Sequence, residues 1–145
     1  MTLPAERTKT NQTHLVYLND MMMDIINQLP VHTNSAFIFT GARGVGAKQF
    51  SKSKKELDAQ MLAYLKREGH LADGEILERW TLHDLRRTAR TGFSRLKIEK
   101  DVKKKLLNHK LGGMDDVYDM WEYFDEKKEA LERWCALVRT IISTK

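Results

Sequence analysis

Apolar residues recur three or four positions apart in four segments of this 145-residue chain, and this spacing limits the fold more than any other feature. Side chains at this spacing share one face of an α-helix, which is buried against a core. The sequence therefore predicts four helices, with the apolar faces Leu57, Met61, Leu62, Leu65; Leu85, Ala89, Phe93, Leu96; Val102, Leu106, Leu107; and Leu131, Trp134, Cys135, Val138, Ile142. We expect Leu85, Phe93, Leu106 and Trp134 to be largely buried.

The N-terminal part of the chain predicts a small sheet and one short helix. Residues 14–18, HLVYL, alternate as in a strand, and with residues 4–10 they predict an antiparallel hairpin whose polar turn lies near residues 9–12. Asn19 is expected to cap a helix that Pro30 ends. The predicted fold class is thus mainly α with a small N-terminal antiparallel β-sheet, in a single domain over residues 1–145.

Composition restricts the classes of partner. Lys and Arg outnumber Asp and Glu by 25 to 20, which suits a polyanion. The lone Cys135 cannot form an internal disulfide, and no Cys/His spacing resembles a zinc site. No apolar run resembles a signal peptide or a membrane span. We expect a cytoplasmic protein without metal, cofactor, membrane partner or small-molecule substrate.

One stretch, residues 80–123, combines residues that carry chemistry. His83 and Arg86 lie three positions apart at the start of a predicted helix, His109 follows Asn108, and Tyr118 comes nine positions after His109. Each residue alone is common on a solvated surface, but their joint order is rare by chance. This order resembles the catalytic core of tyrosine recombinases. Integrases of prophages and genomic islands have segments similar to HDLRRTART, LNHK and DEKKEALERW of this chain.

The resemblance implies a fold, an activity and a set of roles. The fold is that of a tyrosine-recombinase catalytic domain, and the activity is site-specific recombination of double-stranded DNA, with self-association on the DNA. Tyr118 is the implied nucleophile, which forms a 3′-phosphotyrosine without metal or ATP. Arg86, His83 and His109 hold the phosphate oxygens, where negative charge accumulates in the transition state. Lys9, in the hairpin turn, protonates the departing 5′ oxygen.

Three other features of the sequence bear on this assignment. Lys103, Lys104 and Lys105 form a basic run that we expect to be exposed and to touch the DNA backbone. Tyr123 is a rival nucleophile, but it lies too far from His109 for the spacing of the family, so we interpret it as structural. Residues 41–48, GARGVGAK, nearly spell a phosphate-binding loop, but Ala47 interrupts the motif and a nucleotide site is not expected.

The resemblance also implies parts that precede residue 1 of this sequence. Enzymes of the family carry another catalytic arginine upstream of the hairpin, and an N-terminal DNA-clamping domain. We therefore expect an N-terminally truncated catalytic domain that is inactive alone. One alternative is a catalytically defunct integrase remnant that only binds DNA or docks a partner. Another is a plain helical scaffold protein, in which the order of the four residues is a coincidence.

Overall fold

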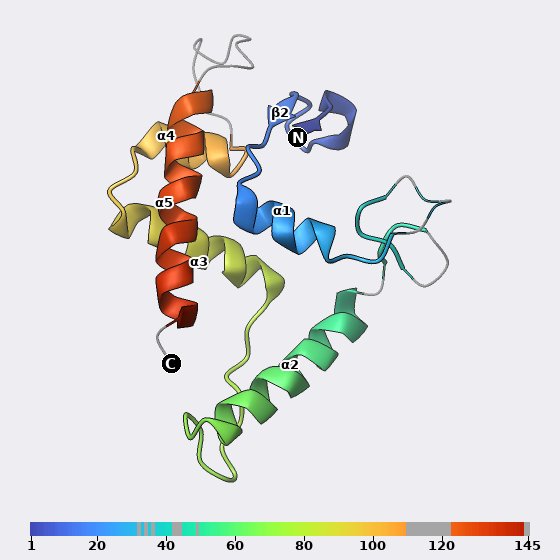
Figure 1. The fold of residues 1–145 in the computed structure, drawn as a ribbon, viewed down its shortest axis with the longest axis vertical. Helices are drawn as coiled ribbons and strands as arrows, with labels where there is room; N and C mark the ends of the chain where they lie inside the picture. Colours follow the sequence, from blue (N-terminus) through green and yellow to red (C-terminus); the bar gives the residue numbers. More distant parts are fainter. Residues whose placement is uncertain are drawn as a thin grey trace. The chain divides into compact units, whose positions relative to one another are not determined.

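The chain is described by a computed structural model, which covers residues 1–31, 33, 35, 37–41, 45–48, 50–109 and 123–143. Its elements follow the order β1 (Thr2–Leu3), η1 (Ala5–Arg7), β2 (His14–Leu15), α1 (Asp20–Asn27), α2 (Phe50–Arg67), α3 (Leu82–Arg95), α4 (Lys100–Leu106) and α5 (Phe124–Ser143) (Figure 1). The predicted mainly helical fold with a small N-terminal antiparallel sheet is confirmed. The chain divides into two compact units: unit 1 holds Met1–Ile25 and Leu85–Lys145, and unit 2 holds Ile26–Asp84.

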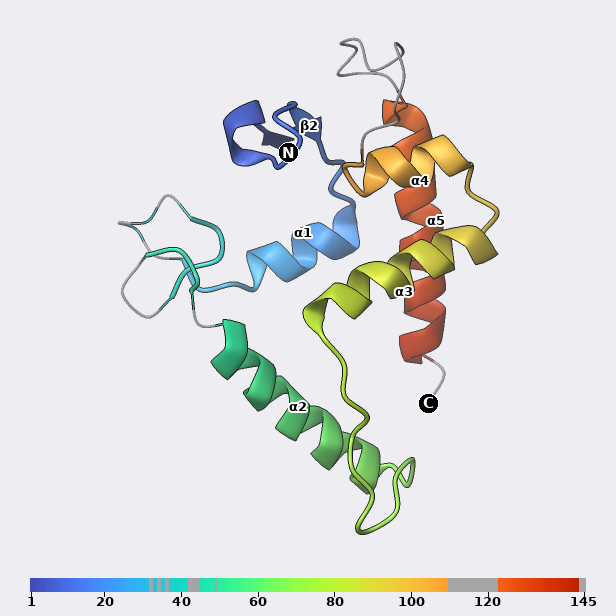
Figure 2. The same ribbon diagram turned by 180° about the vertical axis from the view of Figure 1, so that it is seen from behind.

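Unit 1 contains the core, which forms where α5 crosses α3 and α4 (Figures 1 and 2). Its buried cluster consists of Phe93, Ile98, Val102, Leu107, Ala130 and Leu131. Phe93 meets the ring of Trp134 edge to face, with 5.6 Å between the ring centroids. Aromatic pairs of this geometry add about 0.5–1.5 kcal/mol beyond the apolar area they bury. The core thus fixes α3 and α4, which carry most of the predicted site residues.

The burial expected from the helical spacing is correct in part. Phe93 is buried, while Leu106 and Trp134 are half-buried. The expectation for Leu85 is wrong, because its side chain is 57% exposed. The buried residues of α3 are Gly92 and Phe93, about two turns further along the helix, and the apolar stripe extends beyond the part of α3 that is covered.

A methyl group at Gly92 has no room in this core. An ideal Cβ at Gly92 would lie 2.0 Å from Cζ3 of Trp134. Gly92→Ala is expected to lower the free energy of unfolding by about 1–3 kcal/mol, the usual cost of overpacking. This loss outweighs the gain of up to about 1 kcal/mol that alanine brings to a helix interior relative to glycine. Chemical denaturation of the two proteins measures the difference.

The control for this substitution is the same change in a chain that carries Trp134→Leu. There the ring that blocks the new methyl group is absent, so Gly92→Ala should be neutral or stabilising. If Gly92→Ala stabilised the chain while Trp134 was present, the close packing of α3 on α5 would be wrong.

The hairpin is present, but its first strand, β1, lies before the predicted residues 4–10, and β2 is shorter than the predicted residues 14–18. Leu3 pairs with His14 and Thr2 with Leu15 in antiparallel register. Pro4 follows β1 directly, and since proline lacks an N–H it cannot continue the ladder. A 3-10 turn, η1, therefore occupies part of the segment predicted as the first strand. Asn11, with φ +54°, closes the polar turn that carries Lys9.

Contacts with α5 hold the hairpin and the segment after it in place. The Lys127 ammonium, although it belongs to a buried residue, donates a hydrogen bond to the carbonyl of Leu15 at 3.4 Å. Tyr17 donates its hydroxyl proton to Glu132 at 2.7 Å, and its ring meets Phe124 edge to face. Burial of the imidazole and the nearby Lys127 charge lower the pKa of His14 in β2. Leu15 of β2 and Tyr17 after it are thus both held by α5.

The helix caps agree with the sequence. The side chain of Asn19 accepts a hydrogen bond from the N–H of Met22 at 3.1 Å, and this N-cap starts α1 as expected. In unit 2, Gly69 follows α2 with φ +73°, a left-handed conformation that glycine adopts without strain.

A cation–π contact joins α2 to the segment before α3: the Lys54 ammonium lies 3.8 Å from the centre of the Trp80 ring. Within the described residues, no helix combines the length and apolarity that crossing a membrane requires.

Candidate functional site

The predicted site begins at the N-terminus of α3, where Thr81 and Asp84 are hydrogen-bonded to each other. The N–H and the hydroxyl of Thr81 both donate to the carboxylate of Asp84, at 2.9 and 2.8 Å. His83 is exposed in the first turn of α3, and Arg86 follows one turn later. His83 belongs to unit 2, so we describe its position along α3 and not its position relative to the residues of unit 1.

Arg86 connects α3 to the loop that carries His109. Its guanidinium donates a hydrogen bond to the carbonyl of Leu107, the residue that caps α4. Asn108 then adopts a left-handed conformation, with φ +49°, and the N–H of His109 donates to the carbonyl of Lys104 at 2.8 Å. Arg86 and His109 are therefore brought together although 23 positions separate them in the sequence.

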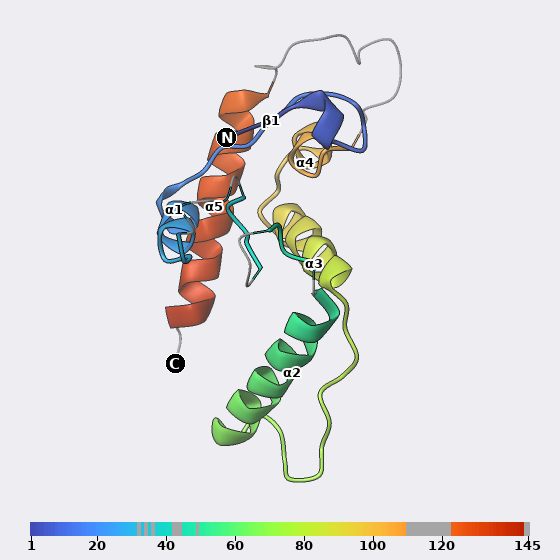
Figure 3. The same ribbon diagram turned by 90° about the vertical axis from the view of Figure 1, so that its right-hand side faces the viewer.

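The hairpin turn reaches the same loop. The hydroxyl of Thr10 donates to the side-chain carbonyl of Asn108 at 3.3 Å, across 98 positions of sequence. Lys9 is the neighbour of Thr10 and is exposed in this turn. Figure 3 shows the hairpin beside α4. Arg86 and the hairpin turn that carries Lys9 thus both contact one loop, residues 107–109, which we call the His109 loop.

The electrostatic environment of His109 is positive. Loss of hydration and the charges of Arg86 and Arg90 lower the pKa of its imidazole. A lowered pKa favours the neutral ring, which keeps one N–H donor at neutral pH. Two guanidinium groups and an imidazole N–H together make a site suited to a phosphate, because each can donate to its oxygens.

Comparisons with known proteins provide no further support. No family model, curated protein or solved structure matches this chain. The resemblance to tyrosine recombinases therefore rests on the sequence motifs alone. Among the described residues, no group of three or more His, Cys, Asp or Glu side chains could hold a metal ion.

The structure describes one of the two candidate nucleophiles. Tyr118, the predicted nucleophile, lies outside the described residues. Tyr123 is described: it packs against the core cluster, and its carbonyl accepts a hydrogen bond from the N–H of Lys127 at 2.9 Å. Tyr123 thus has a structural role at the start of α5, as the sequence suggested.

The three lysines of α4 are less exposed than expected. Lys103, Lys104 and Lys105 are all half-buried, so the expectation of full exposure is wrong. Lys104 pairs with Asp101 at 3.0 Å on the same helix. Lys103 reaches α3, where its ammonium donates to the hydroxyl of Ser94 at 3.1 Å. Lys103 and Lys104 therefore have different partners.

Sequence reasoning missed Arg90. It lies four residues after Arg86, so the two share a face of α3, and its charge acts on His109. The spacing from Arg86 was the available signal. The motif formed by His83 and Arg86 ends four residues before Arg90, so the resemblance does not single it out.

Proposed function

We propose that this chain is the catalytic domain of a tyrosine recombinase of the phage-integrase type, which cuts and rejoins double-stranded DNA. Arg86 and the hairpin turn both bond to the His109 loop, and this convergence carries the proposal. The sequence resemblance predicts that these three segments belong to one site. A helical scaffold with a coincidental motif gives no reason for them to meet.

In this proposal each residue acts on one scissile phosphate. Arg86 keeps N–H donors beyond the one bonded to Leu107, and these can hold two phosphate oxygens as a fork. His109 and His83 donate hydrogen bonds to the same group, and His83 also exchanges a proton with the tyrosine hydroxyl. Tyr118 attacks phosphorus and displaces the 5′ oxygen of the next nucleotide, which Lys9 protonates.

The two bond changes balance without an external energy source. One phosphodiester bond breaks while one phosphotyrosine ester forms, so the reverse attack by a 5′ hydroxyl reseals the strand. The preorganised cations lower the barrier because negative charge grows on the nonbridging oxygens. Neither a metal nor ATP takes part in this proposed sequence of steps.

A nicked suicide substrate tests the activity. The chain is fused behind the upstream segment of an integrase of this family, which supplies the further arginine that the resemblance implies. Cleavage near the nick releases a short 5′-hydroxyl fragment that diffuses away, so the phosphotyrosine cannot be resealed. A covalent protein–DNA adduct on a denaturing gel supports the proposal. DNA binding without any adduct would instead favour the defunct, binding-only remnant.

Binding of the unfused chain to DNA gives a second prediction. We expect weak binding to labelled duplexes of unrelated sequence, with an affinity that falls steeply as salt rises from about 50 to about 200 mM, because each neutralised phosphate releases counterions. Fluorescence anisotropy at several salt concentrations measures this slope. An affinity that does not change with salt concentration, or no binding at about 50 mM salt, would count against a DNA enzyme.

A further inference from the structure

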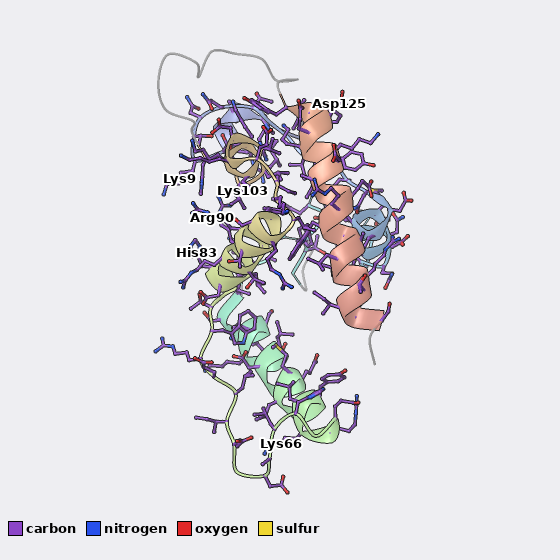
Figure 4. The ribbon with its side chains drawn as sticks, turned by 90° about the vertical axis from the view of Figure 1, so that its left-hand side faces the viewer. Lys9, Lys66, His83, Arg90, Lys103 and Asp125 are labelled. Atoms are coloured by element: carbon purple, nitrogen blue, oxygen red, sulfur yellow. The ribbon has the colours of Figure 1, made fainter. Side chains whose placement is uncertain are left out.

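The segment that forms most of α3, all of α4 and the His109 loop is more basic than the chain as a whole. Residues 85–109 contain nine Lys and Arg but only two acidic residues, a surplus of seven, against a net charge of +5 for the whole chain. Figure 4 shows Arg90 and Lys103 on the side of unit 1 that also bears Lys9, with Asp125 elsewhere, at the start of α5.

Two contacts between α3 and α4 fix this surface. At one end Arg86 bonds to the carbonyl of Leu107, and at the other Lys103 bonds to the hydroxyl of Ser94. Arg86, Arg90 and Ser94 follow one another at intervals of four along α3, so they form one stripe, with Arg90 in the middle.

The Lys103 ammonium is held next to Arg90. The hydroxyl of Ser94 accepts from Lys103 and donates to the carbonyl of Arg90, both at 3.1 Å. An ammonium has three N–H donors, so this bond leaves others for a ligand. A side chain that is already ordered loses less conformational entropy on binding.

Arg90 is exposed, and the described residues give it no acidic partner. Within the part of the chain that the structure describes, no carboxylate forms an ion pair with its guanidinium, whereas Arg133 of α5 lies 3.5 Å from Glu129. An exposed cation between two fixed cations attracts an extended polyanion more strongly than a single small anion, since several of its charges are neutralised together.

We propose that Arg90 and Lys103 form a second phosphate-binding strip, which holds backbone phosphates adjacent to the one bound by Arg86 and His109. This inference rests on the proposed function, because it takes duplex DNA as the ligand. The strip contacts phosphates and not base edges, so it contributes affinity and register on the duplex without sequence preference. This strip differs from the DNA contact predicted from the sequence, which used Lys103, Lys104 and Lys105 of α4.

The test measures the salt dependence of DNA binding by the full chain, with Arg90→Gln as the main variant. Loss of one phosphate contact should weaken binding by a similar factor on unrelated duplexes and reduce the slope of log K against log salt by about 1. Arg90→Lys should restore the slope, because an ammonium neutralises a phosphate equally well. Lys103→Gln should reduce the slope in the same way as Arg90→Gln.

Arg139→Gln is the matched control, because Arg139 is an exposed arginine of α5 outside the strip and its replacement removes the same charge. Thermal melting of all variants excludes misfolding, and the exposed Arg90 makes a folded variant the expected result. If the chain binds DNA but Arg90→Gln and Arg139→Gln have equal slopes, the strip is wrong and the proposed function stands. If the chain binds no DNA, both are wrong.

Discussion

Arg86→Lys should slow covalent adduct formation on the suicide substrate by about a hundredfold to a thousandfold, the usual effect of removing one preorganised donor to an anionic transition state. Lysine keeps the charge but loses the planar fork that can hold two phosphate oxygens. The rate is measured in a single turnover with the fused protein in excess. Binding to DNA should change much less than the rate.

The substitution to lysine is preferred to alanine because Arg86 also has a structural contact. The bond to the Leu107 carbonyl holds the His109 loop, and alanine would remove that bond together with the fork. A lysine ammonium can still donate to a carbonyl, so the loop is expected to persist. Arg139→Lys serves as the matched control. An Arg86→Lys adduct rate within about tenfold of the unsubstituted protein would exclude Arg86 as the phosphate fork, given the magnitude above.

Local features of the fold could be predicted well because their causes are local. Asn19 caps α1 through its own side chain, and Gly69 ends α2 through its own backbone conformation. The turn at Lys9 is polar and contains Asn11, a residue that tolerates a left-handed conformation. In each case the chemistry of a few neighbouring residues determines the structure.

Burial could be predicted less well because it depends on distant segments. The spacing of α3 places Leu85 and Phe93 on related positions of one stripe, but only the part that α5 covers is buried. Lys127 is the opposite case. A lysine is expected to be solvated, yet this one is buried where the carbonyl of Leu15 lies within hydrogen-bond distance. Neither outcome follows from helical periodicity. Periodicity predicts which face of a helix is apolar, but not which other segment covers that face.

The candidate site shows the same division. Residue order suggested Arg86, His109 and Lys9, and their segments do meet at the His109 loop. Arg90 was missed because its significance comes from a position between two contacts with α4, and one of those contacts depends on Ser94 and Lys103. A resemblance selects the residues that a family shares, so it overlooks a cation whose role would arise from the packing of this chain.

The nucleophile is the assignment with the largest expected effect. Tyr118→Phe in the fused protein should abolish the adduct, because the substitution removes only the hydroxyl that becomes the phosphate ester. DNA binding should be unchanged, since phenylalanine keeps the ring. Tyr123→Phe is the matched control: its ring packs on the core and its carbonyl bonds to the N–H of Lys127, and both contacts survive the substitution.

The site of attachment settles which tyrosine reacts. After digestion with a protease and a nuclease, mass spectrometry should find the nucleotide remnant on the peptide that contains Tyr118. The contrast between the two variants is sharp because a missing nucleophile cannot be replaced by the remaining cations, which only stabilise charge that the attack creates. A remnant on Tyr123, or an adduct that forms at full yield in Tyr118→Phe, would show that the recombinase assignment has the wrong nucleophile.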